Sequence, residues 1–332
     1  MIAKENEFKE LCQKRGLSYQ EIEMAVQELQ MLSNKLCSEI SNLEILSLDK
    51  IESYIDERTK SGTANEAMLI AYIRYYSMIK RDDVSIRLLS YLNPIGILPA
   101  MAEHLEALEG KKVREKVMEN LKIPPIASKP EDYPTVTSAF TKNLEKEVGT
   151  VKAQQILAWN VHGIPAEPWL KEKEEFLRST SLEQWLKNLH DRRIAEIEKH
   201  AIDGTLWFEQ KITMRVVDYV RNNQEILSGV SDGRYIYATK IPFNPDGFLS
   251  ASSDFEKRKY ACHCPLAASS LNEKGADTPP LWCYCSAGFE KFIFDTVFDF
   301  DTKIEVLESV LAGDIRCRFR IEIPETVRKR FL

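Results

Sequence analysis

The sequence lacks three features that would assign a chain to a broad class before any motif is considered. It contains no apolar run approaching the roughly 18–20 residues that span a bilayer. Its N-terminus, MIAKENEFKELCQKRG, lacks the apolar stretch of a secretory signal. A basic excess is also missing, because 45 Lys and Arg residues face 51 Asp and Glu residues, giving a net charge of −6. These absences predict a cytoplasmic protein with neither a membrane nor a nucleic acid as its partner.

The sequence does contain enough apolar material for a folded core. Hydrophobic residues make up 44% of its 332 residues, and aromatic residues are spread along its length. Disordered chains are poor in such residues, so most of this chain should fold. Its length allows two domains, since domains usually have about 100–200 residues. In a reducing cytoplasm its seven cysteines should be free, metal-bound or reactive rather than paired in disulfides.

The first two thirds of the chain show helical patterning. Apolar residues recur every three or four positions over Tyr19–Ile40. Further helices are predicted at Leu48–Arg58, Ala64–Ile79, Val84–Leu92 and Leu98–Leu108, which gives an α-helical domain over residues 1–122. Four prolines then predict an extended connector over residues 123–135, because proline lacks a backbone donor. A helical segment, residues 136–205, follows with helices at Val136–Trp159 and Leu182–Ala201.

Residues 206–332 have a different character and predict a cysteine-rich α+β domain. The segment Arg234–Pro242 is rich in β-branched and aromatic residues, which favours a strand. Lys303–Leu311 and Ile315–Ile323 predict a β-hairpin, and in its second strand Phe319 and Ile321 share the apolar face. The predicted fold class is therefore α+β, with a helical N-terminal region and a C-terminal α+β domain that contains an antiparallel sheet.

Five of the seven cysteines lie in this last region, at Cys262, Cys264, Cys283, Cys285 and Cys317. The first four form two Cys-x-Cys pairs, and in extended backbone residues i and i+2 point to the same side. Four thiolates from two such segments could surround a zinc ion at about 2.3 Å, so zinc is the cofactor that this pattern suggests. The alternative is that several of these cysteines are small core residues, and that alternative is favoured for Cys317.

Cys264 differs from the other cysteines because Pro265 follows it. Proline is favoured at the first position of a helix, which predicts a helix over Leu266–Leu271 with Cys264 as its N-cap. Unsatisfied backbone donors and the positive end of the helix dipole would then favour thiolate over thiol. Cys264 is accordingly a candidate nucleophile, and it is equally well placed to be a metal ligand.

Other polar residues are candidates for the same site. His162 lies in Asn-Val-His-Gly-Ile-Pro, an irregular segment that either carries function or simply satisfies its own turn. Glu209 follows two large aromatic residues and is either a general acid or base, or a surface residue. Ser286 and Gly288 lie in a stretch of small residues that either lets backbone amides approach an anionic ligand or merely turns the chain. Lys240, at the end of the predicted strand, is a candidate ligand-binding cation.

Several of these motifs resemble known families. The strings NVHGIPAEPW, YACHCP, WCYCSAGFEKF and GDIRCRF resemble an uncharacterised bacterial family, found mainly in Firmicutes, that has no assigned function. More distantly, the last quarter resembles the L-2-amino-thiazoline-4-carboxylic acid hydrolase-like group and the 4-vinyl-reductase-like ligand-binding domains. That group has Cys-Pro, a Cys with Asp three positions on, and a Gly before Cys-x-Phe. The matching residues here are Cys264, Pro265, Cys283, Gly313, Cys317 and Phe319, with Ser286 in place of the Asp. This resemblance implies an α+β ligand-binding fold.

Two functions from different classes are compatible with these residues. The first is a hydrolase-type enzyme for a small anionic or sulfur-containing metabolite, in which Cys264 is nucleophile or ligand and His162 or Glu209 moves protons. The second is a non-catalytic sensor whose thiols bind a metal or small ligand and whose helical part passes this on to a partner. Both functions require a small-molecule ligand, and both leave a homo-oligomer open.

Overall fold

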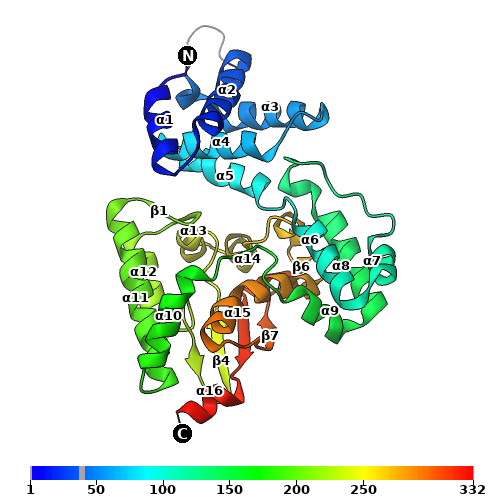
Figure 1. Cartoon of the computed structure of the whole chain (residues 1–332), viewed down its shortest axis with the longest axis vertical. Coiled ribbons are helices and arrows are strands. Elements are labelled where there is room, and N and C mark those ends of the chain that lie inside the picture. Colours follow the sequence, from blue (N-terminus) through cyan, green and yellow to red (C-terminus); the bar gives the residue numbers. More distant parts are fainter. Residues whose placement is uncertain (1, 37–41, 332) are drawn as a thin grey trace. The chain divides into compact units, whose positions relative to one another are not determined.

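The structure is a computed structural model that describes residues 2–36 and 42–331. It divides into two compact units, Met1–Gly96 with Lys122–Tyr133, and Ile97–Leu121 with Pro134–Leu332 (Figure 1). The predicted α+β class is confirmed, because the first unit is helical and the strands lie in the second. The units differ from the expected domains in two respects. Residues 97–121 belong to the second unit, and most of the proline-rich connector belongs to the first.

The first unit is built from five α-helices among the described residues. They are α1 (Glu5–Lys14), α2 (Tyr19–Leu36), α3 (Leu48–Lys60), α4 (Glu66–Met78) and α5 (Asp82–Leu92), with short 3-10 turns at Leu43–Ile45 and Pro130–Asp132. Four of these helices follow the predicted segments closely, although the end of the predicted Tyr19–Ile40 helix lies outside the described residues. Their apolar faces meet in one core that contains Phe8, Leu29, Tyr72 and Tyr75.

One segment of the described chain, Asp82–Glu109, is apolar and long enough to cross a membrane by length and composition alone. The sequence predicts no such segment. It comprises α5 and α6 (Ile97–Glu109), which a turn at residues 93–96 separates, and 44% of its apolar window is buried. Buried core helices pass the same test, so the segment is weak evidence for a membrane span.

The second unit surrounds a small sheet with helices. The helices are α6, α7 (Lys111–Met118), α8 (Pro134–Val148), α9 (Thr150–Leu157), α10 (Glu167–Arg178), α11 (Leu182–Asp203), α12 (Met214–Arg221), α13 (Pro245–Ser250), α14 (Asp254–Ala261), α15 (Tyr284–Phe298) and α16 (Glu325–Arg330). The predicted helix Val136–Trp159 is divided between α8 and α9. The break falls at Gly149, whose φ of 79° is left-handed and open to glycine at little cost.

The sheet has four antiparallel strands in the order β3-β4-β8-β7. They are β3 (Val230–Ser231), β4 (Tyr235–Thr239), β7 (Ile304–Glu308) and β8 (Arg318–Glu322). The predicted strand at residues 234–242 and the predicted hairpin are both found. Two two-residue pairs lie apart from this sheet, β1 (Leu206–Trp207) with β2 (Gln210–Lys211) and β5 (Leu271–Asn272) with β6 (Gly275–Ala276).

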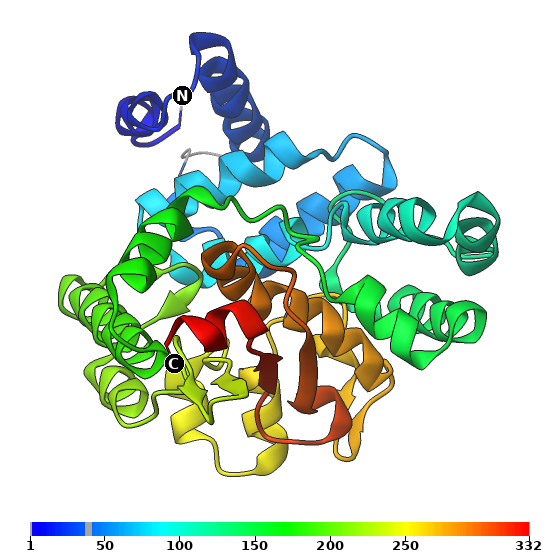
Figure 2. The ribbon, with the colours of Figure 1, turned by 60° about the horizontal axis from the view of Figure 1, so that its bottom comes forward.

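The two faces of the sheet have different surroundings. Phe319 and Ile321 are fully buried, as their alternation predicts, and pack in a core with Trp185 of α11 and Phe294 of α15. Figure 2 shows the ribbon of these elements from a second direction. Short 3-10 turns at Pro280–Cys283 and Val310–Ala312 connect α15 and β7 to their neighbours. On the other face, arginines of β8 pair with carboxylates, as in the contact of 2.7 Å between Arg318 and Glu225. Core packing therefore fixes both the register of β8 and the rotation of α15.

Replacing Ile321 by Ala should test this core. The fully buried side chain leaves a cavity, and such changes cost about 2–5 kcal/mol of unfolding free energy. Arg320→Ala, on the opposite face of the same strand, removes an exposed ion pair and should cost less than about 1 kcal/mol. Urea unfolding followed by tryptophan fluorescence measures both. Equal losses for the two variants would contradict the assignment of faces.

Candidate functional site

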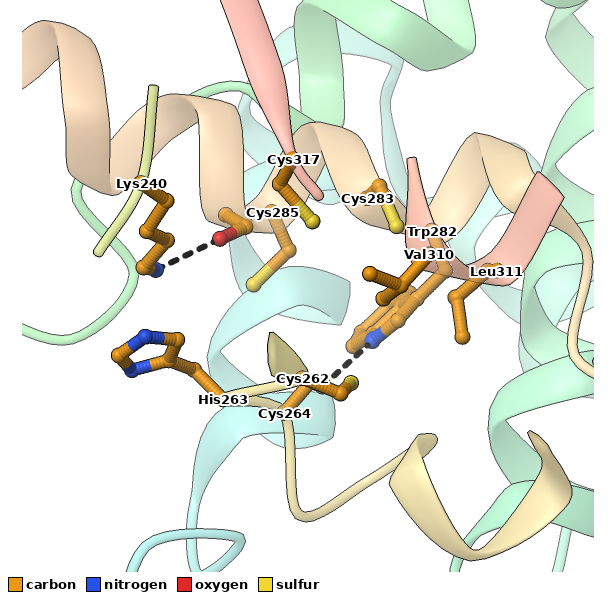
Figure 3. A pocket seen from close by; sticks show the side chains of 11 residues that line it. Lys240, Cys262, His263, Cys264, Trp282, Cys283, Cys285, Val310, Leu311 and Cys317 are labelled. Carbon is orange, nitrogen blue, oxygen red and sulfur yellow. Dashed lines mark hydrogen bonds between the residues drawn. The ribbon is translucent and has the colours of Figure 1, made fainter. Parts of the chain in front are cut away.

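A small cavity in the second unit gathers residues from five segments of the chain. Its volume is about 30 Å³, enough for a few water molecules or one small chemical group. Figure 3 shows five cysteines around it. The lining residues are Lys240, Cys262, His263, Cys264, Trp282, Cys283, Cys285, Ser286, Val310, Leu311 and Cys317. Every cysteine of the predicted α+β region therefore lines one space.

Three polar residues of this lining lie at the start of α15. Cys283 is the residue before the helix, and Cys285 and Ser286 lie in its first turn. The first amides of a helix have no partner within the helix, and its N-terminus carries a partial positive charge. The Ser309 hydroxyl donates a hydrogen bond to the Cys283 Sγ at 2.9 Å. The first amide of α15 already donates to the Leu281 carbonyl in the preceding 3-10 turn, so the start of this helix contributes positive potential, and Ser309 contributes a donor.

Cys264 is not the N-cap of a helix, so that prediction is wrong. A turn and a three-residue 3-10 helix at Ala268–Ser270 follow it instead. The indole Nε1 of Trp282 donates a hydrogen bond to the Cys264 Sγ at 3.2 Å (Figure 3). Burial nevertheless raises the pKa of the Cys264 thiol above its ordinary value, although the Trp282 contact acts in the opposite direction. The backbone amides of Leu266 and Ala267 also lower the pKa of Cys264, so backbone donors are present as expected, but burial outweighs them and no α-helix follows.

The four cysteines predicted to bind zinc share the cavity, but they do not form a ready metal site. Within the described residues, no group of three or more His, Cys, Asp or Glu side chains is arranged to hold a metal ion. The prediction assumed extended backbone at both pairs, whereas Cys283 and Cys285 lie at the start of a helix. Helical residues i and i+2 do not face each other. Burial also raises the pKa of the Cys262 and Cys283 thiols, which disfavours the thiolates that a metal needs.

His162 lies beside Cys285, which the sequence did not predict as its partner. The His162 Nε2 and the Cys285 Sγ are 3.9 Å apart, across 123 positions of the sequence. Burial, with a smaller contribution from Lys240, lowers the pKa of His162 below its usual value. Burial raises the pKa of the Cys285 thiol. At neutral pH the pair is therefore a neutral imidazole and a neutral thiol.

The loop that carries His162 is fixed by its own sequence. The Asn160 side chain donates to the carbonyl of Ile164 and accepts from its amide, both at 2.9 Å, and closes the loop between them. Gly163 takes a φ of 59° inside this closed turn. One alternative was that His162 only forms hydrogen bonds to the backbone of its own turn. In the structure the Asn160 side chain forms those bonds instead.

Gly288 does not line the cavity. A Cβ built on this glycine would lie 2.3 Å from the carbonyl oxygen and 2.5 Å from the backbone nitrogen of Trp159. Only a residue without a side chain lets α15 approach this backbone so closely. Since Trp159 is three residues before His162, Gly288 sets how near the His162 loop comes to α15. Its contacts explain the glycine without a ligand.

Lys240 and Ser286, the other two predicted ligand-binding residues, meet at the cavity. The Lys240 Nζ donates to the Ser286 Oγ at 2.7 Å (Figure 3). It also lies 4.7 Å from the centre of the Phe289 ring. The backbone amide of Lys240 donates to the carbonyl of Cys317 at 2.9 Å, which extends the pairing of β4 with β8. Sheet pairing thus positions this cation at the cavity.

Glu209, predicted to transfer protons, lies outside the cavity lining. It sits in the two-residue turn that joins β1 to β2, next to Phe208, whose φ is 52°. The buried polar residue of this hairpin is Gln210, which donates to the Pro242 carbonyl at 2.5 Å. Of the two neighbouring aromatic residues, Trp207 is buried in a core and Phe208 is exposed, so they do not enclose a carboxyl group beside the thiols.

Two site residues escaped the sequence analysis. The His263 Nε2 lies 2.6 Å from the carbonyl oxygen of Ile241, and burial is the main reason that its pKa falls to about 3. Its position between two cysteines was a signal that could have identified it. Glu290 lies one helical turn after Ser286, and burial raises the pKa of its carboxyl group, with Lys240 acting in the opposite direction. Glu290 follows Ser286 by four residues, which on a helix places both on the same face, and this spacing could have identified it.

Gly288→Ala should disturb the site through backbone crowding. The added methyl overlaps the backbone at Trp159, so we expect a loss of about 1–3 kcal/mol in unfolding free energy and a displaced His162 loop. Gly149→Ala is a matched control, because that position has positive φ but open space. Urea unfolding compares the two variants. A smaller loss at Gly288 than at Gly149 would show that close approach is unimportant there.

Part of this site lies in a segment that is similar to a known protein family. Residues 243–328 match a family of unknown function, DUF6144. The matched range contains the five cavity cysteines and α15, whereas Lys240 and His162 precede it. No curated protein and no solved structure matches the chain. Over residues 243–328, the predicted similarity to an uncharacterised family is therefore confirmed.

Proposed function

We propose that this protein is a hydrolase-type enzyme for a small anionic or sulfur-containing metabolite. Cys285 is the nucleophile and His162 is the general base. The observation that carries this proposal is the 3.9 Å contact between the Cys285 Sγ and the His162 Nε2 beside the start of α15. A thiol and an imidazole within reach of each other form the usual unit of covalent thiol catalysis.

The chemistry follows from the neutral state of the pair. As the Cys285 sulfur bonds to an electrophilic carbon of the substrate, its proton passes to the His162 Nε2. The imidazolium then gives that proton to the departing nitrogen or sulfur atom as its bond to carbon breaks. The same imidazole then takes a proton from water as the water oxygen bonds to that carbon, the carbon–sulfur bond breaks, and the imidazolium returns the proton to the Cys285 sulfur. A histidine that is neutral at rest is suited to accept the first proton.

Other groups of the cavity have separate roles in this proposal. Lys240 and Ser286 hold the anionic part of the substrate, since they meet at the lining. The positive end of the α15 helix dipole favours negative charge that develops on the substrate. Cys264 is not the nucleophile in this proposal, because its sulfur accepts a hydrogen bond from the Trp282 indole, whereas the Cys285 sulfur faces an imidazole. The small volume restricts the reacting part of the substrate to a few atoms.

The wider assignments remain part of the proposal. The distant resemblance to the thiazoline-carboxylate hydrolase-like group supports a hydrolytic reaction. The motifs also suggest a bacterial family that is found mainly in Firmicutes. The described cysteines are free, which suits a reducing, cytoplasmic location. Ser286 occupies the position of that group's Asp, and its hydroxyl accepts a hydrogen bond from Lys240, so the proposal assigns proton transfer to His162.

A second function is favoured by the gathering of five cysteines around one cavity. In this alternative the protein is a sensor that binds zinc or another thiol-seeking ligand. Zinc would require the cysteine pairs to rearrange, because the described side chains contain no ready group of three ligands. Elemental analysis of the purified protein, with thiol counting before and after metal removal, distinguishes the two functions. Stoichiometric zinc with four protected thiols would overturn the assignment of Cys285 as a free nucleophile.

Variants of the pair test the enzymatic proposal directly. The probe is S-acetylthioglycolate, a small anionic thioester whose cleavage is followed by loss of its ultraviolet absorbance. Cys285→Ala should abolish turnover, and His162→Gln should lower it by about 10²–10⁴-fold, because both remove a group needed for proton transfer. Cys12→Ala, a buried cysteine of the first unit, is the control and should retain activity. Undiminished turnover in Cys285→Ala would refute the proposal.

The pH dependence follows from the pKa of His162. The base must be neutral, so activity is present above its pKa and is lost as pH falls through it. Because burial lowers that pKa below the ordinary value of about 6.5, the acid limb of kcat/KM should lie below pH 6.5. The Cys285 thiol, whose pKa is raised, stays protonated at neutral pH. An acid limb at or above pH 6.5 would show that His162 is not the base.

A further inference from the structure

We infer that Phe289 forms an outer subsite for the leaving group of the substrate, so that the protein prefers an anionic leaving group with an apolar substituent, joined to a small acyl group. This inference rests on the proposed function, because it concerns a substrate that reacts with Cys285. It adds a specificity residue that lies outside the cavity lining in the described part of the chain.

The space beside Cys285 is too small for a whole metabolite. The cavity has a volume of about 30 Å³, and the Cys285 side chain on its wall is buried. A group the size of acetyl is the most that such a space takes. The remainder of the substrate must therefore lie outside the cavity, on surface that borders Cys285.

Solvent meets this site on the side of His162 and Phe289. His162, whose Nε2 lies 3.9 Å from the Cys285 Sγ, is exposed. Phe289 follows Cys285 by four residues on α15, so the two side chains lie on one face of the helix. Cys285 is 4% exposed and Phe289 is 45% exposed, so this face leads from buried to open surface within one helical turn. The part of the substrate that stays outside the cavity therefore passes Phe289.

The Phe289 ring contacts both groups that act on the leaving group. Its centre lies 4.7 Å from the Lys240 Nζ and 6.2 Å from the centre of the His162 ring, and the two ring planes are 77° apart. In the proposed reaction Lys240 holds the anionic part of the substrate, and His162 gives its proton to the departing atom. Because both contact one ring, the anion and the departing atom belong to the same part of the substrate. That part lies against Phe289, and the acyl group enters the cavity.

The exposed ring offers an apolar contact to the leaving group. Its contact with the Lys240 ammonium group leaves apolar ring surface in water. A ligand that covers this surface removes it from water, which favours binding, and an aromatic group can also stack on the ring or meet its edge. A leaving group with an aromatic substituent beside its carboxylate gains this contact. A larger acyl group gains nothing, because the cavity does not hold it.

Matched thioesters measure both halves of this preference. S-acetylthioglycolate is the reference compound. S-acetyl-2-mercapto-3-phenylpropanoate keeps the acetyl and carboxylate groups and adds a benzyl group to the leaving group, whereas S-pentanoylthioglycolate enlarges the acyl group instead. In the unmodified protein, kcat/KM should be roughly tenfold higher for the benzyl compound and roughly tenfold lower for the pentanoyl compound than for the reference. Loss of ultraviolet absorbance follows each reaction.

The variants assign the benzyl preference to Phe289. Phe289→Ala should bring the benzyl compound to within about twofold of the reference, while the pentanoyl compound stays as poor as before. Phe300→Ala is the matched control, because it removes another phenylalanine, 51% exposed, beyond the end of α15, and should behave as the unmodified protein. Ratios are compared within each variant, so a general loss of activity through Lys240 or His162 does not alter the outcome. An unchanged benzyl preference in Phe289→Ala, or a pentanoyl compound that reacts as fast as the reference, would overturn the inference.

The same measurements separate this inference from the proposed function. If the unmodified protein cleaves none of the three thioesters, the assignment of Cys285 as nucleophile fails, and the inference that rests on it fails too. If the unmodified protein cleaves them and Cys285→Ala does not, but the benzyl and reference compounds react equally, the nucleophile stands and only the outer subsite at Phe289 is lost.

Discussion

The close approach of α15 to the backbone at Trp159 is the constraint on which the site depends. Gly288 permits this approach, since any side chain there would collide with main-chain atoms. Farther along the helix, Phe294 is buried against Trp185, which fixes the rotation of α15 about its axis. With rotation and depth both fixed, Cys285 is directed toward the His162 loop. The chemistry of the site is therefore a consequence of how one helix packs on the core.

Burial and charge then decide which chemical states the site can hold. Surrounding protein raises the pKa of the thiols that line the cavity and lowers the pKa of His263 to about 3, so these groups are neutral at pH 7. His162, which is exposed and lies beside Cys285, also has a lowered pKa. Lys240 is the exception, and its partners are a hydroxyl and an aromatic ring. Elsewhere in this unit, the buried Lys291 side chain pairs with Asp295 at 2.8 Å, and the buried Arg258 donates to three backbone carbonyls. The hydroxyl and ring partners of Lys240 leave its charge uncompensated by a direct carboxylate, which is why the proposal assigns the anionic part of the substrate to it.

The sequence predicts what local periodicity determines and misses what distant contacts determine. Alternation identified the buried face of β8, because Phe319 and Ile321 obey a two-residue period wherever the strand pairs. The cysteines of the second unit line one cavity, yet the two-residue spacing at Cys283 was assigned to a strand when it begins a helix. No local pattern could pair His162 with Cys285, since their contact depends on Gly288 and on the packing of α15. The predicted helix after Cys264 was wrong for the same reason. The local helix signal from Pro265 was outweighed by the burial of this segment among distant residues.

The enzymatic function is favoured over the metal sensor by the number of protons that must move. A zinc site of four cysteines requires deprotonation of several thiols whose pKa values burial has raised, and it brings a dication close to Lys240. Each of these steps opposes binding unless the cavity reorganises. A thiol nucleophile needs only one proton to leave Cys285, and a neutral imidazole lies 3.9 Å from that sulfur to accept it. The positive charge of Lys240 then assists the reaction, because it attracts an anionic substrate and stabilises negative charge that forms near Cys285.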